Sequence, residues 1–476
     1  MPESSKFLPF ALDTNDPEFR ADRRALLEQA ARAAIAYLDA ENESAVEPSG
    51  QAVAALERFR EPAPELPASA SQVLELLAKV AAPATIRKTA GRNFGFVNGG
   101  CLPAALAAAW QVSAWDQNAS FFVQSPAAVT LEEIALGWVR EMLRLPEGTG
   151  GALTTGATMA NFTALAAARH ALLARQGWNV EEDGLYGAPE IRVVVGEEAH
   201  ASIFKALGLL GLGRKRVVRV PVDDQGRMRA DSLPELDDRT ILCLQAGNVN
   251  TGAFDPAATL APVARKAGAW IHVDGAFGLW ARTAPPFHAL VEGFDLADSW
   301  ATDGHKWPNM GYDCGIALVR EPEQLHAAMS IRAAYLLIGE RREPTDYNPE
   351  LSRRARGVEL WAALKSLGRS GMAQLVERTS KHARRFAEGL HAAGYEILNE
   401  VVINQVLVSF GSPEKTLRTI EKIQQDGTCW CGSTVWQEHT AMRISVSSWA
   451  TSDEDVERSL QAMLRAAAEV NGELGR

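Results

Sequence analysis

The chain has 476 residues, 47% of them hydrophobic and 22% charged, so it can bury a large core, and we expect two or three packed lobes. Its formal net charge of -11 at pH 7 argues against nucleic acid or an anionic membrane surface as the main partner, because both select a basic face. No stretch approaches the roughly 20 apolar residues that span a bilayer, and the N-terminus shows no signal-peptide core. We therefore expect a cytoplasmic protein.

Five scattered cysteines in a chain of this length do not indicate a disulfide framework. Cys429 and Cys431 flank a tryptophan, but no second Cys or His pair lies at ligand spacing, so we expect no metal site. A small anionic ligand stays possible despite the negative net charge, because backbone amides can hold an anion without basic side chains.

The predicted elements begin with helical periodicity over 16–40, followed by a Pro-rich run over 61–67. From about residue 91 the pattern changes to short apolar runs that alternate with helices. This alternation predicts a large α/β domain with a mainly parallel sheet. The apolar runs lie at 191–195, 216–220, 241–244, 269–273 and 315–319.

A long helical pattern over 352–368 leads away from the sheet region. Beyond it, apolar runs at 401–410 and 442–447 indicate a smaller α+β region. We predict three parts of the chain on this basis. They are an N-terminal helical arm over 1–90, a large α/β domain over 91–368 and a small C-terminal α+β domain over 369–476.

Two segments carry the strongest signal for chemistry. A predicted strand ends in His272-Val-Asp274-Gly-Ala276, and Lys306 follows Asp274 by 32 positions in the sequence His305-Lys306-Trp307. Pyridoxal phosphate needs such a pair, because it forms a Schiff base with a lysine and a carboxylate keeps its ring nitrogen protonated. Each residue also has a plainer explanation, a surface lysine or a strand-end cap, but their combination favours the cofactor.

A phosphate cradle is expected before this pair. Thr155-Gly156-Ala157-Thr158 opens a long apolar helix with small residues, and free amides at a helix N-terminus bind phosphate. The alternative is an ordinary helix N-cap by Thr154 or Thr155. His200 follows the predicted strand 191–195, at the edge where open α/β sheets bind ligands, so its ring could stack on the cofactor or simply begin a helix.

Together these segments resemble the group II pyridoxal-phosphate-dependent decarboxylases, the family of aromatic-amino-acid, histidine and glutamate decarboxylases. The resemblance covers most of the chain and implies the PLP-dependent transferase fold type I, the aspartate-aminotransferase fold. It implies that Asp274 partners the ring nitrogen, that Lys306 forms the Schiff base and that His200 and Ala276 pack on opposite ring faces. The expected phosphate contacts are Gly156, Ala157, Thr158 and His305.

The resemblance also assigns residues outside this group. The loop over 247–255 departs from the Thr-rich version of better-known members, and we expect Asn250 on it to contact the cofactor. Tyr347 lies in a segment similar to the family's mobile catalytic loop, whose tyrosine reaches the neighbouring subunit's site and protonates Cα. This tyrosine favours decarboxylation over oxidative deamination to an aldehyde. Arg443 resembles an arginine that meets the substrate carboxylate, although it could equally pair with an acidic neighbour.

The segment 92–126 lines the substrate pocket by resemblance, with Phe96 and Asn98 as substrate contacts. It contains no Lys or Arg after Arg92, whereas an acidic substrate would want a cation there. We therefore expect decarboxylation of an aromatic or other neutral L-amino acid to the amine and CO2. A carbon-carbon lyase, an aldehyde synthase or a transaminase is the alternative. The resemblance further implies an obligate homodimer with shared active sites.

Overall fold

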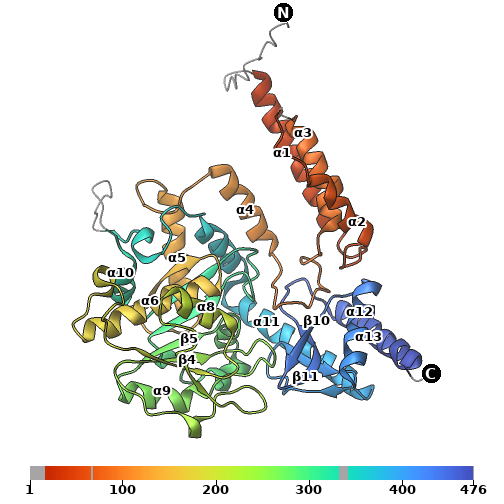
Figure 1. The fold of residues 1–476 in the computed structure, drawn as a ribbon. Coiled ribbons are helices and arrows are strands. Elements are labelled where there is room, and N and C mark those ends of the chain that lie inside the picture. Colours follow the sequence, from red (N-terminus) through yellow and green to blue (C-terminus); the bar gives the residue numbers. More distant parts are fainter. Residues whose placement is uncertain (1–16, 66–67, 332–340, 475–476) are drawn as a thin grey trace, which may run out of the picture. The chain divides into compact units, whose positions relative to one another are not determined.

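The computed structural model describes residues 17–65, 68–331 and 341–474 (Figure 1). Its internal contacts divide the chain into two units, Met1–Arg87 and Lys88–Arg476, and each is described by itself. The first unit is helical, as the periodicity over 16–40 predicts. Its elements are α1 (Pro17–Asp39), α2 (Gly50–Ala54), η1 (Ala55–Phe59), α3 (Ala70–Leu76), η2 (Leu77–Ala81) and η3 (Ala82–Ala84).

Polar contacts join the first helix of this unit to the segment that follows it. The Gln29 side chain donates to the Ser71 carbonyl at 3.2 Å, and the hydroxyls of Tyr37 and Thr85 lie 2.7 Å apart. Large apolar side chains nevertheless stay exposed on the unit, including Leu27, Ile35, Val53, Val73 and Leu77. The unit therefore offers apolar surface that it does not cover itself.

The second unit is built on a seven-stranded sheet with the order β1-β7-β6-β5-β4-β2-β3. Neighbouring strands from β3 to β6 pair in parallel, whereas β7 pairs antiparallel with both β1 and β6. The sheet is thus mainly parallel, as predicted. The strands are β1 (Gly150–Thr154), β2 (Arg192–Gly196), β3 (Val218–Val220), β4 (Thr240–Gln245), β5 (Trp270–Asp274), β6 (Ser299–Asp303) and β7 (Gly315–Val319).

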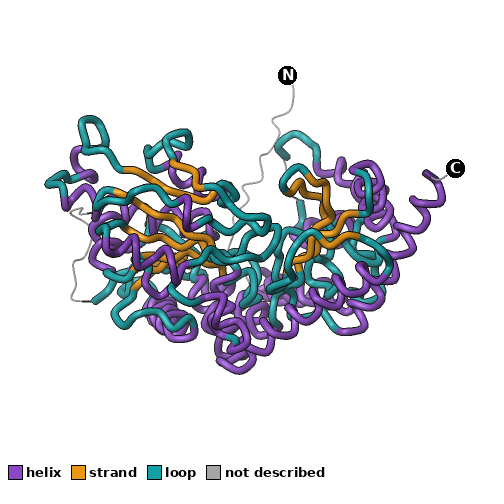
Figure 2. Tube along the Cα trace, turned by 90° about the horizontal axis from the view of Figure 1, so that it is seen from below, coloured by secondary structure: helices purple, strands orange, loops and turns teal. Residues whose placement is uncertain are grey.

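Helices cover both faces of this sheet, and Figure 2 shows the strands enclosed by helices. Alternate strand residues face opposite layers: Ile241 packs in a core with α6 and α8, and Leu242 in a second core with α9 and α11. Burial on both faces explains why the central strands are continuous apolar runs. The helices are α4 (Pro103–Trp115), α5 (Pro126–Met142), α6 (Ala157–Arg175), α7 (Val180–Asp183), α8 (Ala201–Leu209), α9 (Ala257–Lys266), α10 (Pro322–Met329) and α11 (Arg356–Ala392).

Short 3-10 turns connect these layers. They are η4 (Ala230–Ser232), η5 (Gly278–Thr283), η6 (Pro285–Val291), η7 (Phe294–Leu296) and η8 (Pro344–Tyr347). None of the helices in the described ranges is both long and apolar enough to cross a bilayer.

A smaller antiparallel sheet with the order β10-β11-β9-β8 follows α11 and has its own apolar core. Helix α11 joins the two sheets and is interrupted at Gly368, whose φ of 60° and ψ of -178° are not helical. The elements are β8 (Glu396–Ile397), β9 (Gln405–Ser409), α12 (Pro413–Asp426), β10 (Gly432–Trp436), β11 (His439–Ser445) and α13 (Asp453–Leu474).

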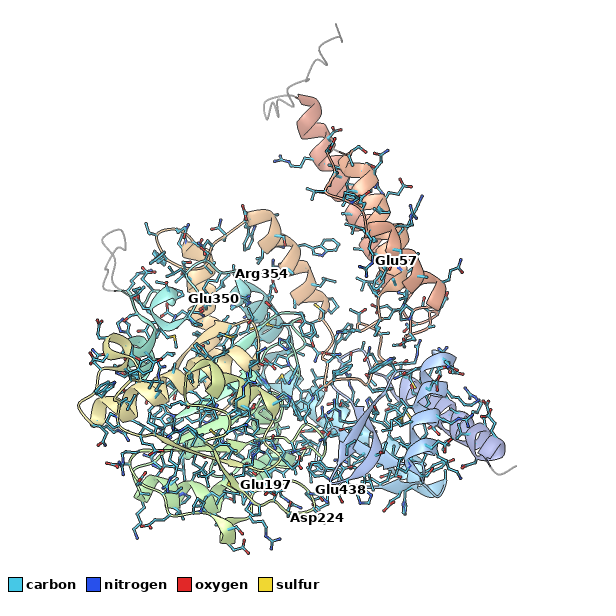
Figure 3. The ribbon with its side chains drawn as sticks, viewed as in Figure 1. Glu57, Glu197, Asp224, Glu350, Arg354 and Glu438 are labelled. Carbon is cyan, nitrogen blue, oxygen red and sulfur yellow. The ribbon has the colours of Figure 1, made fainter. Side chains whose placement is uncertain are left out.

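The β10–β11 turn meets the loop after β3, where the Gln437 side chain donates to the Asp223 carbonyl at 2.9 Å. Arg227 and Glu400 form an ion pair of 3.1 Å across the same junction. Figure 3 shows that the outer surface near this junction carries the acidic side chains of Glu197, Asp224 and Glu438.

Candidate active site

A cavity of about 430 Å³ lies at the carboxyl ends of the strands in the large sheet. Open α/β sheets bind their ligands at this edge, because the loops that follow the strands converge there. The residues that line the cavity include most of those predicted to bind the cofactor. They are Gly156, Ala157, Thr158, His200, Asp274, Ala276, His305 and Lys306.

Asp274 ends β5, and its carboxylate is fixed by donors on both oxygens. Its Oδ1 accepts from the Ala276 backbone N–H at 3.3 Å. Its Oδ2 accepts from the Asn161 amide at 3.1 Å and lies 3.2 Å from the Ser202 hydroxyl. The Asp274 side chain is therefore buried and held in one orientation at the wall of the cavity.

Lys306 lies on the loop after β6, beside the carboxylate that ends this strand. Its Nζ is 3.4 Å from Asp303 Oδ2 and 5.7 Å from the centre of the Phe277 ring, a cation–π distance. Gly99 allows the backbone to pass close behind the lysine, because a Cβ there would lie 2.0 Å from the Lys306 carbonyl oxygen. The amine is thus held at the cavity by an ion pair and an aromatic face.

His305 is a neutral imidazole in this arrangement. The Cys314 backbone N–H donates to its Nδ1 at 3.0 Å, so its proton is on Nε2, which lies 3.5 Å from Asp303 Oδ2. Burial lowers the pKa of His305, although Asp303 opposes this effect. The Tyr312 ring stacks on the imidazole with centroids 4.4 Å apart.

His200 begins α8 and lines the cavity from the side of β2. The Ser202 backbone N–H donates to His200 Nδ1 at 3.2 Å, and the Ser202 hydroxyl lies 2.8 Å from the same nitrogen. His200 is therefore also the helix N-cap that the sequence left as an alternative. Loss of hydration lowers its pKa, against the attraction of Asp274, while Lys306 and Arg443 lower it further. A neutral ring in this position can stack on a flat ligand.

The start of α6 forms an anion cradle. Its N-cap is Gly156, with φ 157°, and no side chain caps the helix. Thr154 and Thr155 thus do not act as the ordinary N-cap that was the alternative. Side chains rarely tolerate the φ of 157° at this position, so glycine suits the turn that leads into the first helical amides. Uncapped amides and the helix dipole favour a phosphate group here.

Several cavity residues were not predicted, namely Ser202, Lys205, Gln245 and Phe277. Ser202 and Lys205 come two and five residues after His200. Residues three apart lie on one side of a helix, so both side chains of α8 can face the cavity beside His200. That spacing is a signal the sequence contained. Phe277 directly follows Ala276, but its contact with the lysine depends on how two loops pack.

Asn250 and Arg443 lie together at the contact between the large domain and the small sheet, and neither lines the cavity. Asn250 Oδ1 accepts from the Thr434 hydroxyl at 2.9 Å and from an Arg443 guanidinium nitrogen at 3.4 Å. Burial lowers the pKa of Arg443, which forms no ion pair with the described residues. The acidic neighbour that the sequence left open for Arg443 is thus not found in the described part of the chain.

Phe96 and Asn98 are placed next to this region and also lie outside the cavity lining. The Phe96 ring stacks on Trp430 at 5.4 Å while the residue keeps 66% of its surface exposed. Asn98 is buried and accepts a hydrogen bond from the Tyr312 hydroxyl. Its amide nitrogen has no hydrogen-bond partner among the described residues.

Tyr347 lies in η8 and packs against α10 of its own chain. Its ring is 5.4 Å from the His326 ring and 4.3 Å from the Arg342 guanidinium. It does not line the cavity of its own chain. Burial raises the pKa of Tyr347, partly offset by Arg342, so the phenol keeps its proton at neutral pH. Its predicted role at a partner's site stays a prediction.

Gly275 lies between Asp274 and Ala276 at the end of β5, and packing explains why this position holds a glycine. A Cβ at position 275 would lie 2.6 Å from the Leu279 Cβ, inside the helical turn η5. Asp274 and Ala276 keep their places on either side of it, because the tight turn needs the smallest residue between them.

This geometry is that of a pyridoxal-phosphate site: a lysine and a fixed carboxylate face one cavity beside an uncapped helix N-terminus, on a fold of type I. The fold comparison agrees. A structure of the Oryza sativa protein titled TDC with PLP and tryptamine superposes with a TM-score of 0.88 at 22% identity, covering 95% of this chain and 99% of that chain. Mouse CSAD superposes with a TM-score of 0.86 at 21% identity, covering 94% and 99%.

The family model of the pyridoxal-dependent decarboxylase conserved domain matches residues 54–411. The chain belongs to this family, and its cofactor is pyridoxal 5'-phosphate. The residues present fit this cofactor, because the uncapped amides suit its phosphate, Lys306 its aldehyde and Asp274 its ring nitrogen.

Curated relatives within the family differ in activity. The aromatic-L-amino-acid decarboxylase of Drosophila lebanonensis is 29% identical over 380 residues, which cover 73% of this chain and 91% of that protein. The L-2,4-diaminobutyrate decarboxylase of Acinetobacter baumannii is 27% identical over 319 residues, so the match spans 62% of each protein. Phenylacetaldehyde synthase of Arabidopsis thaliana is 29% identical over 288 residues, which cover 56% of this chain and 57% of that protein.

Proposed function

We propose that this protein decarboxylates an L-amino acid with an aromatic or other neutral side chain, releasing the amine and CO2. The observation that carries the proposal is the arrangement of Lys306, Asp274 and His200 around one cavity in a chain of the decarboxylase family. Pyridoxal phosphate, when bound, supplies an aldehyde for an amine and a ring that accepts the electron pair of the broken bond. The protein supplies position and charge.

Each cavity residue has a physical task in this proposal. Asp274 would hold the proton on the ring nitrogen, because donors from its own chain fix its carboxylate at the wall of the cavity. His200 and Ala276 hold the ring between them. Lys306 would hold the cofactor through its aldehyde, and its amine would then no longer pair with Asp303.

Arg443 is proposed to bind the substrate carboxylate. Arg443 is half-buried and its guanidinium lies within electrostatic range of His200, so it is near the cavity although it does not line it. A half-buried cation without a carboxylate partner among the described residues attracts an anionic group from a ligand. Asn250 orients it through the hydrogen bond between their side chains.

The preference for a neutral side chain rests on three arginines that could otherwise pair with an acidic side chain, because each has a partner in its own chain. Arg92 pairs with Asp455 at 3.3 Å and donates to the Thr428 carbonyl at 2.7 Å. Arg341 lies 4.1 Å from the centre of the Phe122 ring, and Arg342 donates to the Gly151 carbonyl. None of these three is free to receive an acidic side chain in its own chain.

We further propose a homodimer whose active sites are shared. Exposed aromatic and apolar side chains gather in the segment 92–126, including Phe96, Trp110, Trp115 and Val123. Apolar surface of this kind marks a protein contact more often than free surface. A second copy that covered this surface would bury these side chains. A cytoplasmic location is part of the same proposal.

The test is CO2 release from cofactor-loaded protein across the standard L-amino acids and common non-protein ones. We expect release from aromatic or other neutral amino acids and none from aspartate or glutamate. Release from acidic or diamino acids alone would overturn the substrate class. Consumption of an amino acid without CO2 would instead favour a lyase or a transaminase.

An aldehyde synthase is the second candidate function, because relatives such as the Arabidopsis thaliana phenylacetaldehyde synthase carry that name. The protonated phenol of Tyr347 argues for the amine, since it can donate a proton to Cα. We expect Tyr347→Phe to keep cofactor binding and to divert product from amine toward aldehyde, as measured by chromatography of both products.

Two further tyrosines make this test specific. Tyr186, which is 98% exposed, is the matched control, and Tyr186→Phe should leave the product ratio unchanged. Tyr335 lies in 332–340, outside the described residues. Tyr347 would be excluded as the proton donor if Tyr335→Phe diverted product from amine to aldehyde while Tyr347→Phe left the amine yield unchanged.

A further inference from the structure

A line of buried polar side chains lies behind Asp274, on the side away from the cavity, and the function proposed above uses only its last member, Asn161. Trp270, His272 and Asp274 alternate along β5 and so face the same layer as α6. His272 is fully buried, as are Asn161 on α6 and Ser299 on β6. Polar groups at such depth are costly unless they are hydrogen-bonded to one another.

The contacts run in one unbroken line. Trp270 Nε1 donates to Ser299 Oγ at 2.9 Å, and Ser299 Oγ lies 2.9 Å from His272 Nδ1. His272 Nε2 lies 2.9 Å from Asn161 Oδ1. The Asn161 amide nitrogen then donates to Asp274 Oδ2 at 3.1 Å and to Ser202 Oγ at 3.2 Å. The two ends of the line are an indole N–H and the carboxylate of the cavity.

The chemistry of these groups gives the line a direction. An indole nitrogen can only donate and an ionised carboxylate can only accept, so the amide nitrogen of Asn161 must face Asp274 and its oxygen must face His272. That oxygen only accepts, so the proton of His272 is on Nε2. Burial lowers the pKa of His272 to about 4, so the ring is neutral and its Nδ1 accepts from the Ser299 hydroxyl.

We propose that His272 and Asn161 are positioning residues that fix the charge state of Asp274. The neutral His272, protonated on Nε2, prevents the Asn161 amide from turning over, and the amide then presents a permanent N–H donor to the carboxylate. Each donor bond stabilises the anion relative to the acid. The proton shared between Asp274 and the cofactor ring therefore stays on the ring nitrogen.

This inference rests on the cofactor of the family and not on the substrate proposed above. Its readout is the protonation of the cofactor ring without substrate, so a different substrate would leave the result unchanged. For this reason, an error in the proposed substrate and an error in the proposed role of His272 and Asn161 give different results.

The experiment loads the full-length protein with pyridoxal phosphate labelled with 15N in its ring and records the ring nitrogen resonance. We expect a protonated ring nitrogen in the wild type. Asn161→Leu and His272→Leu should move the resonance toward the unprotonated value. Loss of one hydrogen bond to a charged group is worth roughly one pKa unit, so the proton should shift about tenfold toward the carboxyl group.

Two variants separate positioning from packing. His272→Gln keeps an N–H that can reach Asn161 and should restore much of the wild-type resonance. Thr163→Val is the matched control on α6, because Thr163 is fully buried and its hydroxyl has no partner among the described residues. It should leave the resonance unchanged. The inference would be overturned if both leucine variants, Asn161→Leu and His272→Leu, folded and their cofactor ring nitrogen were protonated to the same extent as in the wild type.

A second measurement needs no disruptive variant. 15N-labelled histidine in the wild-type protein, with His272 assigned by the difference from His272→Gln, reports which ring nitrogen carries the proton. A neutral His272 protonated on Nε2 supports the proposed positioning of Asn161 by His272. A neutral ring protonated on Nδ1, or a doubly protonated ring at neutral pH, contradicts it even if the leucine variants do not fold.

Discussion

Replacing Lys306 with alanine is expected to abolish covalent capture of the cofactor and to lower turnover by roughly 10⁴-fold to 10⁶-fold, the range found when a covalent catalytic group is removed. The reason is geometric. Lys306 is the amine held at the cavity by an ion pair with Asp303, next to the helix N-terminus that suits the cofactor phosphate. Borohydride reduction followed by peptide mass spectrometry measures the result directly, because it fixes the cofactor on its lysine.

Lys205 provides the matched control for this experiment. It lines the same cavity from α8, so Lys205→Ala removes a neighbouring amine without removing the one next to Asp303. We expect the reduced adduct on Lys306 in wild type and in Lys205→Ala, and no adduct in Lys306→Ala. An adduct on Lys205 in the wild type would show that the wrong lysine has been assigned.

Replacing Asp274 with asparagine is expected to lower turnover by roughly 10³-fold, about 4 kcal/mol, comparable to the loss of a strong electrostatic stabiliser of the transition state. The substitution keeps the shape and removes the charge that holds the ring proton. It also places an amide opposite the Asn161 and Ser202 donors, which then lose their anionic acceptor. Steady-state kinetics of cofactor-loaded protein measures the loss.

The control is a buried acid with a purely structural task. Asp255 accepts from the backbone N–H groups of Met228 and Gln245, and burial raises its pKa to about 6. Asp255→Asn should lower thermal stability with little effect on turnover of the folded enzyme. A cofactor with a permanently charged, N-methylated ring should partly restore Asp274→Asn. Equal turnover of Asp274→Asn and wild type would contradict the assignment.

The parallel sheet and the position of its site were predictable because both follow from local patterns. Apolar runs separated by helices indicate strands buried on two faces, and the motifs at Asp274 and Lys306 follow strands that end at the same edge. The order of the strands was not predictable, since β7 inserts between β1 and β6 in the antiparallel direction. Strand order depends on packing between residues far apart in the chain.

The parts of the site that escaped prediction depend on side-chain convergence. Ser202 matters because it lies between His200 and Asp274, and Phe277 because its ring faces Lys306, which no single segment reveals. Phe96, Asn98 and Tyr347 were assigned by resemblance and lie outside the cavity of one chain. The predicted task of Tyr347 is at a second subunit's site, and those of Phe96 and Asn98 depend on a bound substrate, so their positions in one chain do not test them.

The interruption of α11 at Gly368 has a consequence for how substitutions act on such an enzyme. The groups that fit the cofactor all come from the loops of the large sheet before this point, whereas Arg443 comes from the small sheet after it. In the proposed function, cofactor binding and the contact to the substrate carboxylate thus come from separate parts of the fold. Substitutions after residue 368 are therefore expected to change how the amino acid's carboxylate is bound while the cofactor site stays intact.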